Sequence, residues 1–207
     1  MPAKILGRKN SSNVMKVLWC CDEIGIPFDR LDVGGPFGYD HVENYGALNP
    51  NHRVPTIDDD GFILWESNVI VRYLAEKHSE GKLFPSDPKT RWEAEKWMDW
   101  QQTSVRASML IVFLGLIRTP PEDRNPETIE NGRKAAAEAW GILDRHLQGR
   151  NFVTGDEFTM GDIPVGSDVY RWFTLDIERP PLPNLEEWYV RLCARKPYRT
   201  HCMLPLT

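Results

Sequence analysis

The stretch NPNHRVPTI, residues 49–57, decides the fold. It contains a strand-like run interrupted by Pro55, which cannot donate a backbone hydrogen bond. Proline is normally excluded from the middle of a sheet, and a cis X-Pro bond is one good reason to keep it there. A cis bond turns the chain sharply and presents the preceding backbone groups to a ligand. We therefore predict a cis Val54–Pro55 bond beside a site that binds a peptide-like molecule.

A second polar element follows eleven residues after Pro55, where Glu66 and Ser67 stand at the predicted start of a helix. Backbone N–H groups at a helix N-terminus bind carboxylates, and Ser67 adds a hydroxyl. Taken alone, the pair predicts a serine cap preceded by a surface acid. Next to the proline element, it favours a site for the charged end of the same ligand.

Composition excludes several classes of protein. The chain has 207 residues, 41% of them hydrophobic, and a net charge of −5. This length suits one large or two small domains, and the acidic balance argues against a nucleic-acid partner. No apolar run approaches the ~18 residues of a transmembrane helix, so we expect no membrane partner. The first residues show no secretion signal, which predicts a cytoplasmic protein.

The cysteines and histidines indicate neither a metal nor a dithiol site. Cys20 and Cys21 are adjacent, Cys193 and Cys202 are far away, and no C-x-x-C pair exists. Cys20 and Cys21 lie in an apolar helical pattern, which predicts small buried side chains, with a reactive thiol as the alternative. The five histidines are scattered without metal-ligand spacing. We expect no metal.

The first part of the chain predicts an α/β domain. Apolar positions recur at helical spacing from Val14 to Ile24, and Gly25 ends that helix. Asp58 to Gly61 has the composition of a hairpin turn. The resulting β-α-β-α-β-β-α order is thioredoxin-like. The predicted strands are 3–6, 28–33, 54–57 and 62–65, and the predicted helices are 14–24, 41–48 and a third that Ser67 caps and that ends before Gly81.

The second part predicts an all-α domain, a helical bundle. Glycine and prolines in residues 79–88 mark a linker. Long amphipathic segments follow at 89–116, 128–147, 158–173 and 185–194. The expected domains are therefore residues 1–78, the linker 79–88, and residues 89–207.

Small polar residues lie between the first strand and the first helix: Ser11, Ser12 and Asn13. Such residues commonly cap a helix. A hydroxyl there can instead donate to a bound thiolate. Lowering a thiol pKa of roughly 8.5 by two units requires about 2.7 kcal/mol. One hydrogen bond to a charged partner supplies roughly 1.5–3 kcal/mol, and a helix N-terminus adds up to about 1 kcal/mol. One serine therefore suffices without a general base.

These elements together resemble the cytosolic glutathione transferases, specifically the bacterial serine-type enzymes of the nu-class and theta-like branch. Ser11, Asn13 and Lys16 are similar to a Ser/Thr-x-Asn-x-x-Lys pattern of that branch. The resemblance implies that Ser11 and Asn13 face the sulfur of glutathione, with Ser12 as the substitute. We expect Lys16 on the helix surface.

The resemblance also implies the glutathione contacts around the proline. The backbone of Val54, before Pro55, would pair with the cysteinyl part of glutathione, and Arg53 would meet the glycyl carboxylate. Lysine is more usual at the position of Arg53. His52 departs from the family, which commonly has glycine there, and a non-glycine residue in a left-handed turn can shift Arg53.

Further glutathione contacts come from the start of the third helix and from the loop after the second strand. Ser67 would hold the γ-glutamyl carboxylate, and Glu66 would pair with the ammonium group. Phe37 and Tyr39 follow the second strand, where family members often contact glutathione.

The resemblance continues through the helical part and implies a homodimer. Residues 159–162, TMGD, resemble the family's N-terminal capping pattern, and residues 183–197 resemble its C-terminal helix. The second substrate, a small hydrophobic electrophile, would lie between the domains on the first helix of the α-domain. Its candidate contacts are Trp100, Thr103, Ser104, Arg106 and Met109, although aromatic and methionine residues at helical spacing are also typical of a core.

We therefore expect a glutathione transferase that conjugates the thiolate of glutathione, its co-substrate, to hydrophobic electrophiles. Two alternatives stay open at this point. The first is a glutathione-dependent disulfide-bond reductase or peroxidase, which Asn13 favours. The second is a non-catalytic binding module with the transferase fold.

Overall fold

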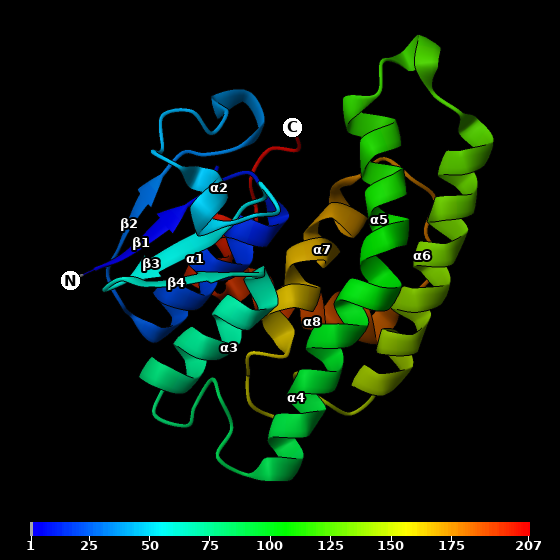
Figure 1. The fold of residues 1–207 in the computed structure, drawn as a ribbon. Coiled ribbons are helices and arrows are strands. Elements are labelled where there is room, and N and C mark those ends of the chain that lie inside the picture. Colours follow the sequence, from blue (N-terminus) through cyan, green and yellow to red (C-terminus); the bar gives the residue numbers. More distant parts are fainter. Residues whose placement is uncertain (1) are drawn as a thin grey trace.

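We determined the fold from a computed structural model that describes residues 2–207 (Figure 1). Its sheet has the strand order β2-β1-β3-β4. β1 pairs in parallel with β2 and antiparallel with β3, and β3 and β4 form a hairpin. This is the thioredoxin-like sheet that the sequence predicts. The strands are β1 (Ala3–Leu6), β2 (Phe28–Leu31), β3 (Thr56–Asp59) and β4 (Phe62–Trp65).

Helix α1 (Ser12–Ile24) lies at the centre of the molecule. It packs against α3 (Ser67–His78) within the first half of the chain and against α7 and α9 of the second half. Every residue from Val14 to Cys21 is buried as a result. Gly25, with φ 71°, ends α1 in the left-handed conformation, as predicted. Two short elements lie between β2 and β3, namely η1 (Gly35–Phe37) and α2 (Tyr45–Leu48).

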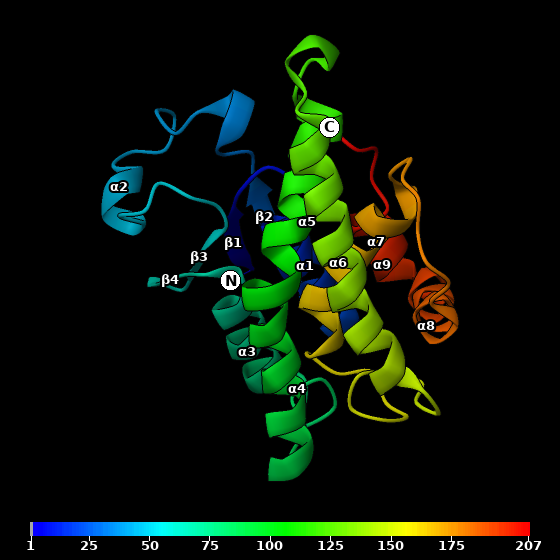
Figure 2. The same cartoon turned by 90° about the vertical axis from the view of Figure 1, so that its right-hand side faces the viewer.

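The second half of the chain is helical, as predicted, and stands beside the sheet (Figures 1 and 2). Its first long helical segment runs without a break from α4 to η3, but its hydrogen-bonding pattern alternates: the α-helical parts α4 and α5 are each followed by a π-helical turn, η2 and η3. The elements are α4 (Pro88–Trp100), η2 (Gln101–Val105), α5 (Arg106–Phe113), η3 (Leu114–Arg118), η4 (Pro121–Asp123), α6 (Pro126–Leu147), α7 (Asp162–Thr174), α8 (Pro183–Ala194) and α9 (Lys196–His201). No helix within residues 2–207 is long and apolar enough to cross a membrane.

Several predicted boundaries differ from the structure, two of them for identifiable reasons. β3 begins at Thr56, not Val54, so the proline element precedes the strand. The helix predicted from residue 158 begins at Asp162, because the preceding residues form a loop that Asp162 caps. The predicted end of the last long helix is confirmed, because α8 ends at Ala194; Pro197 lies in the first turn of the short helix α9, where proline is tolerated.

The two halves meet where Gly166 of α7 crosses Trp19 of α1. A Cβ atom on Gly166 would lie 2.7 Å from the Trp19 ring, so only glycine permits this approach. Trp19 is fully buried, and its ring packs edge-on against Tyr198 of α9 at a centroid distance of 4.8 Å. The sheet domain and the helical domain therefore share one continuous hydrophobic core.

The paired cysteines belong to this core. Cys20 and Cys21 are fully buried, and burial raises the pKa of both thiols, that of Cys21 to about 12. The prediction of small buried side chains is confirmed. A reactive thiol at these positions is inconsistent with that environment.

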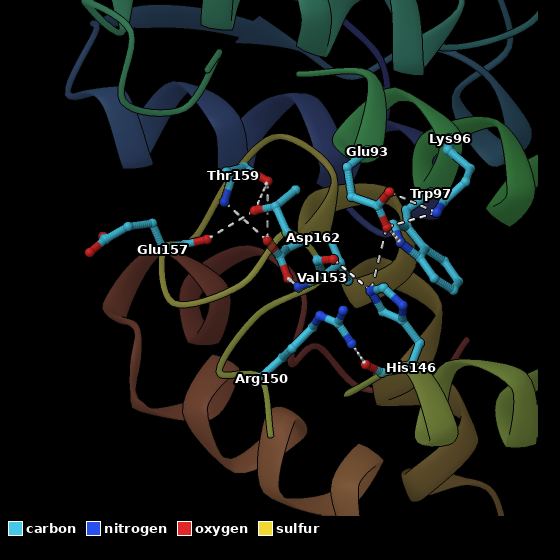
Figure 3. Close-up of polar contacts among 10 residues, drawn as sticks. Glu93, Lys96, Trp97, His146, Arg150, Val153, Glu157, Thr159 and Asp162 are labelled. Atoms are coloured by element: carbon cyan, nitrogen blue, oxygen red, sulfur yellow. Dashed lines mark hydrogen bonds and ion pairs between the residues drawn. The ribbon is translucent and has the colours of Figure 1, made fainter. Parts of the chain in front are cut away.

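Asp162 organises the loop that precedes α7 (Figure 3). Its carboxylate accepts hydrogen bonds from the backbone N–H groups of Val153 and Thr159, both at 3.0 Å, and from Trp188 Nε1 at 2.9 Å. Burial raises the pKa of Asp162 to about 6, and these donors are the groups that favour its ionised form. One side chain thus joins the loop, α7 and α8.

We predict that Asp162→Ala lowers the free energy of unfolding by about 3–5 kcal/mol, because it leaves three buried donors without an acceptor. Urea unfolding followed by circular dichroism measures the change. The control is Asp176→Ala, whose side chain is exposed just after the end of α7 and which should change stability by less than about 0.5 kcal/mol. Equal effects of the two substitutions would contradict the role of Asp162.

Candidate active site

The Val54–Pro55 peptide bond is cis, as predicted. Because β3 begins at Thr56, Val54 lies just outside the strand pairing. Within residues 2–207, its backbone N–H and C=O make no hydrogen bond. This pair of groups forms a short edge that can pair with the backbone of an extended peptide.

Buried polar side chains hold the chain in place ahead of the cis bond. The carbonyl of Arg53 accepts hydrogen bonds from Tyr45 Oη at 2.6 Å and from Asn49 Nδ2 at 2.9 Å. Both donors also contact Thr56 Oγ1, at 2.9 and 3.1 Å. Burial raises the pKa of the Tyr45 hydroxyl, which keeps it a donor. The sequence pattern did not reveal these two residues as parts of the site.

Two glycines allow Val54 to lie against the ends of the neighbouring strands. A Cβ atom on Gly7, after β1, would be 3.3 Å from Val54 Cβ and 2.5 Å from Val14 Cγ2. A Cβ atom on Gly34 would be 3.1 Å from Val54 Cγ1. The cis bond is therefore next to the segment that leads from β1 into α1.

That segment carries the predicted serines. Ser11 occupies the N-cap position of α1, but its side chain makes no capping hydrogen bond. The alternative role predicted for Ser11, capping α1 through its side chain, is therefore not seen in the structure. Ser12 is buried, and its Oγ accepts a hydrogen bond from Arg106 Nη1 at 3.0 Å. Asn13 is half-buried in the first turn of α1.

Glu66 and Ser67 are shifted by one position from the predicted cap. Glu66, with φ 73°, is the N-cap residue of α3, and Ser67 is the first helical residue. The first hydrogen bond of the helix runs from the N–H of Ile70 to the carbonyl of Glu66 at 2.9 Å. The amides of residues 67–69 precede it and have no acceptor within the helix, which makes this end of α3 suited to an anion.

The prediction for Lys16 is wrong. Its side chain is fully buried, because α1 is enclosed on all sides. Its ammonium group donates to Asn68 Oδ1 at 3.0 Å, to Gln101 Oε1 at 3.1 Å and to Ser67 Oγ at 3.4 Å. Burial lowers the pKa of Lys16 to about 7. Lys16 therefore joins α1 to α3 and to the helical domain directly behind Ser67.

The polar contacts continue from Lys16 back to the serine loop. Gln101 Nε2 donates to Asp168 Oδ2 at 2.5 Å, and Asp168 lies 3.8 Å from Arg106 Nη1. The same Arg106 nitrogen binds Ser12 Oγ. Gln101 and Asp168 are buried and belong to the helical domain. The two ends of the candidate site are thus connected through side chains of that domain.

The remaining predicted contacts of glutathione are more exposed. Arg53 and Phe37 are exposed, and Tyr39 is half-buried. The ring of Tyr39 packs against Tyr45 and against His52, at centroid distances of 4.8 and 5.7 Å. His52 has φ 48°, the left-handed conformation that its place in the sequence suggested.

The predicted contacts of the second substrate differ in exposure: all but one are at least partly exposed, and Met109 is buried. Thr103 and Ser104 are exposed on η2, and Arg106 follows them at the start of α5. Trp100 is half-buried, with its ring 5.0 Å from that of Trp97. Met109 lies inside the helical bundle, where its sulfur accepts a hydrogen bond from Trp140 Nε1 at 3.5 Å. It therefore occupies a core position, which was the alternative that its helical spacing allowed.

Comparison with known proteins places this arrangement in a family. The family model for the glutathione S-transferase N-terminal domain matches residues 10–77, and the model for the C-terminal domain matches residues 126–191. Glutathione S-transferase GstB of Escherichia coli K12 is 39% identical over 97% of this chain and 98% of its own length. The chain belongs to the glutathione transferase family.

Solved structures of this family agree with the assignment. The theta-class glutathione S-transferase from Xanthomonas axonopodis pv. citri, crystallised with glutathione bound, is 42% identical, with both chains fully covered and a TM-score of 0.95. Its apo form matches with a TM-score of 0.88 at 38% identity. The chain is thus similar to bacterial glutathione transferases over its whole length.

Proposed function

We propose that this glutathione transferase binds glutathione between the cis Val54–Pro55 edge and the start of α3, and joins its sulfur to hydrophobic electrophiles. The observation that carries the proposal is the unpaired backbone of Val54, which lies against the segment between β1 and α1; that segment also carries Ser11, whose hydroxyl makes no capping hydrogen bond. The edge offers the pairing that a bound peptide backbone needs. The glutathione-bound Xanthomonas enzyme, which is similar over its full length, supports the same ligand.

The charged groups around this edge suit the two ends of glutathione. We assign the γ-glutamyl carboxylate to Ser67 and the amides of the first turn of α3, and the ammonium group to exposed Glu66. The cysteinyl backbone would pair with Val54. Arg53, which is exposed and precedes Val54, would meet the glycyl carboxylate with its planar guanidinium group.

The proposed reaction begins with loss of the thiol proton to solvent. The hydroxyl of Ser11 and the amide of Asn13 donate hydrogen bonds that stabilise the resulting thiolate, and the N-terminus of α1 adds a favourable dipole. The sulfur electron pair then forms a bond to the electrophilic carbon. That carbon either releases a leaving group with its electron pair or, in an addition, passes the pair to an activated atom that takes a proton.

The second substrate is proposed to bind on the face of α5 that follows Arg106. Arg106 reaches Ser12 and therefore points toward the sheet domain. Leu110 lies one helical turn further on the same face, and Leu114 follows another turn later. Both are partly exposed apolar residues, at 37%. An apolar wall of this kind favours hydrophobic electrophiles, and these two leucines extend the set predicted from sequence.

Ser11→Ala is expected to leave glutathione affinity nearly unchanged and to raise the pKa of the bound thiol by up to about two units, because a donor to the thiolate is lost. Ultraviolet titration of the bound thiolate measures this pKa. Ser86→Ala, at an exposed serine of the linker, is the matched control. An unshifted titration in the Ser11 variant would remove that residue from the proposed mechanism.

Leu110→Ser is expected to raise KM for an apolar electrophile about tenfold, since it replaces apolar contact with a hydroxyl. The KM for glutathione should stay within about twofold, because Leu110 does not belong to the glutathione site. Steady-state kinetics with each substrate varied in turn distinguishes the two constants. Val190→Ser on α8, also an exposed apolar position, should change neither. An unchanged electrophile KM would move the second site elsewhere.

We further propose a homodimer. Large apolar side chains are exposed on neighbouring elements of the sheet edge and the first helical turns: Phe62 and Trp65 on β4, Val69 on α3 and Trp92 on α4. Exposed apolar surface of this kind is typical of a protein interface. Light scattering should give twice the mass of one chain, and Trp65→Asp should shift the population toward single chains. A single-chain mass for the unmodified protein at micromolar concentration would refute the dimer.

A further inference from the structure

The buried ammonium group of Lys16 has only neutral direct partners. Its hydrogen bonds within residues 2–207 go to two side-chain amide oxygens and one hydroxyl, those of Asn68, Gln101 and Ser67. Burying a cation without an opposite charge is costly, and such a group tends to lose its proton. The site of Lys16 is therefore electrostatically incomplete until an anion arrives nearby.

The charged groups that face Lys16 offset the cost of burying its charge only in part. Two of them are acids and two are cations, so their effects oppose each other, and burial is the largest influence on its pKa. They come from α7, α5 and the residue before α3: Asp168, Arg171, Arg106 and Glu66. Asp168, the acid with the larger effect, reaches Lys16 only through Gln101.

Ser67 connects Lys16 to the place where an anion would bind. Its oxygen accepts the hydrogen bond from Lys16, which leaves its own hydroxyl proton to be donated outward. Ser67 is also the first residue of α3, where the backbone amides have no helical acceptor. A carboxylate at this point would be separated from the ammonium group by a single hydroxyl.

We propose that Lys16 is a positioning residue that acts through Ser67 as the buried counter-charge of the γ-glutamyl carboxylate, and that glutathione binding draws a proton onto Lys16. This inference rests on the proposed function. No covalent bond changes: in those molecules in which the amine of Lys16 is neutral before binding, it takes a proton from the solvent when the carboxylate binds. The helical domain takes part because Gln101 and Asp168 hold Lys16 in place.

The proposal predicts how many protons are taken up on binding and how affinity depends on pH. Lys16 has a pKa of about 7 without ligand. If the carboxylate raises that pKa by about one unit, binding near pH 7.5 takes up about half a proton. The sign is fixed, since a group whose pKa rises on binding favours the complex at lower pH. Affinity should therefore weaken about sixfold between about pH 6.5 and about pH 8.5.

Isothermal titration calorimetry of the full chain with S-methylglutathione tests the proposal, because this ligand has no titratable thiol. Titrations near pH 7.5 in buffers of different ionisation enthalpy count the protons taken up. The unmodified protein should show an uptake of about half a proton. Lys16→Met, which removes the titrating group at similar volume, and Lys16→Gln, which retains a donor, should abolish the uptake and flatten the pH profile. Lys89→Met, at an exposed position in α4, is the control and should behave as the unmodified protein.

The possible results distinguish a failure of the Lys16 proposal from a failure of the proposed function. Binding without proton uptake in the unmodified protein overturns the role of Lys16, as does an unchanged uptake in the Lys16 variants. If neither variant folds, the measurement on the unmodified protein decides alone, with uptake supporting the proposal and its absence overturning it. Failure of the unmodified protein to bind S-methylglutathione or glutathione at any pH overturns the proposed function itself.

Discussion

The structure depends on the enclosure of α1. This helix packs against α3 on one side and receives α7 on another, and the approach of Gly166 to Trp19 is close enough that only a glycine fits. Because α1 is surrounded, the residues at its N-terminus hold a fixed position between the two domains. The serine loop and the buried lysine owe their surroundings to this packing, since neither would meet the helical domain if α1 lay on the surface.

The candidate site is accordingly a product of both domains, although the residues proposed to touch glutathione lie in the first. Arg106 binds Ser12 beside the proposed sulfur position, and Gln101 binds Lys16 behind the proposed carboxylate position. Both contacts converge on Asp168. One buried carboxylate of the helical domain thus orients groups at two ends of the site, and this explains why polar residues are retained in an otherwise apolar interior.

Local sequence patterns were sufficient for the fold and for the backbone features around the candidate site. The cis bond at Pro55, the glycine end of α1 and the start of α3 all follow from residues close in sequence. The contacts of Lys16 did not follow, since they join residues 51 to 85 positions apart. One signal was available: residues 14–21 are apolar around the whole helix except at Lys16, and a helix of that kind is buried on every side. Tyr45 and Asn49 were missed for a different reason: their partner Arg53 is close in sequence, but a buried hydrogen bond to a backbone carbonyl has no signature in the spacing of residues.

The π-helical turn between α4 and α5 has a geometric consequence. In an α-helix, residues five apart diverge by about 140° around the axis, so they cannot both face one partner. In η2 the N–H of Arg106 bonds to the carbonyl of Gln101, which sets the two residues in one row. Gln101 and Arg106 can both reach Asp168 because the helix is widened there. Loss of a single residue from this turn would restore regular winding and swing one of the two side chains away, so the length of the segment, beyond its composition, is under constraint.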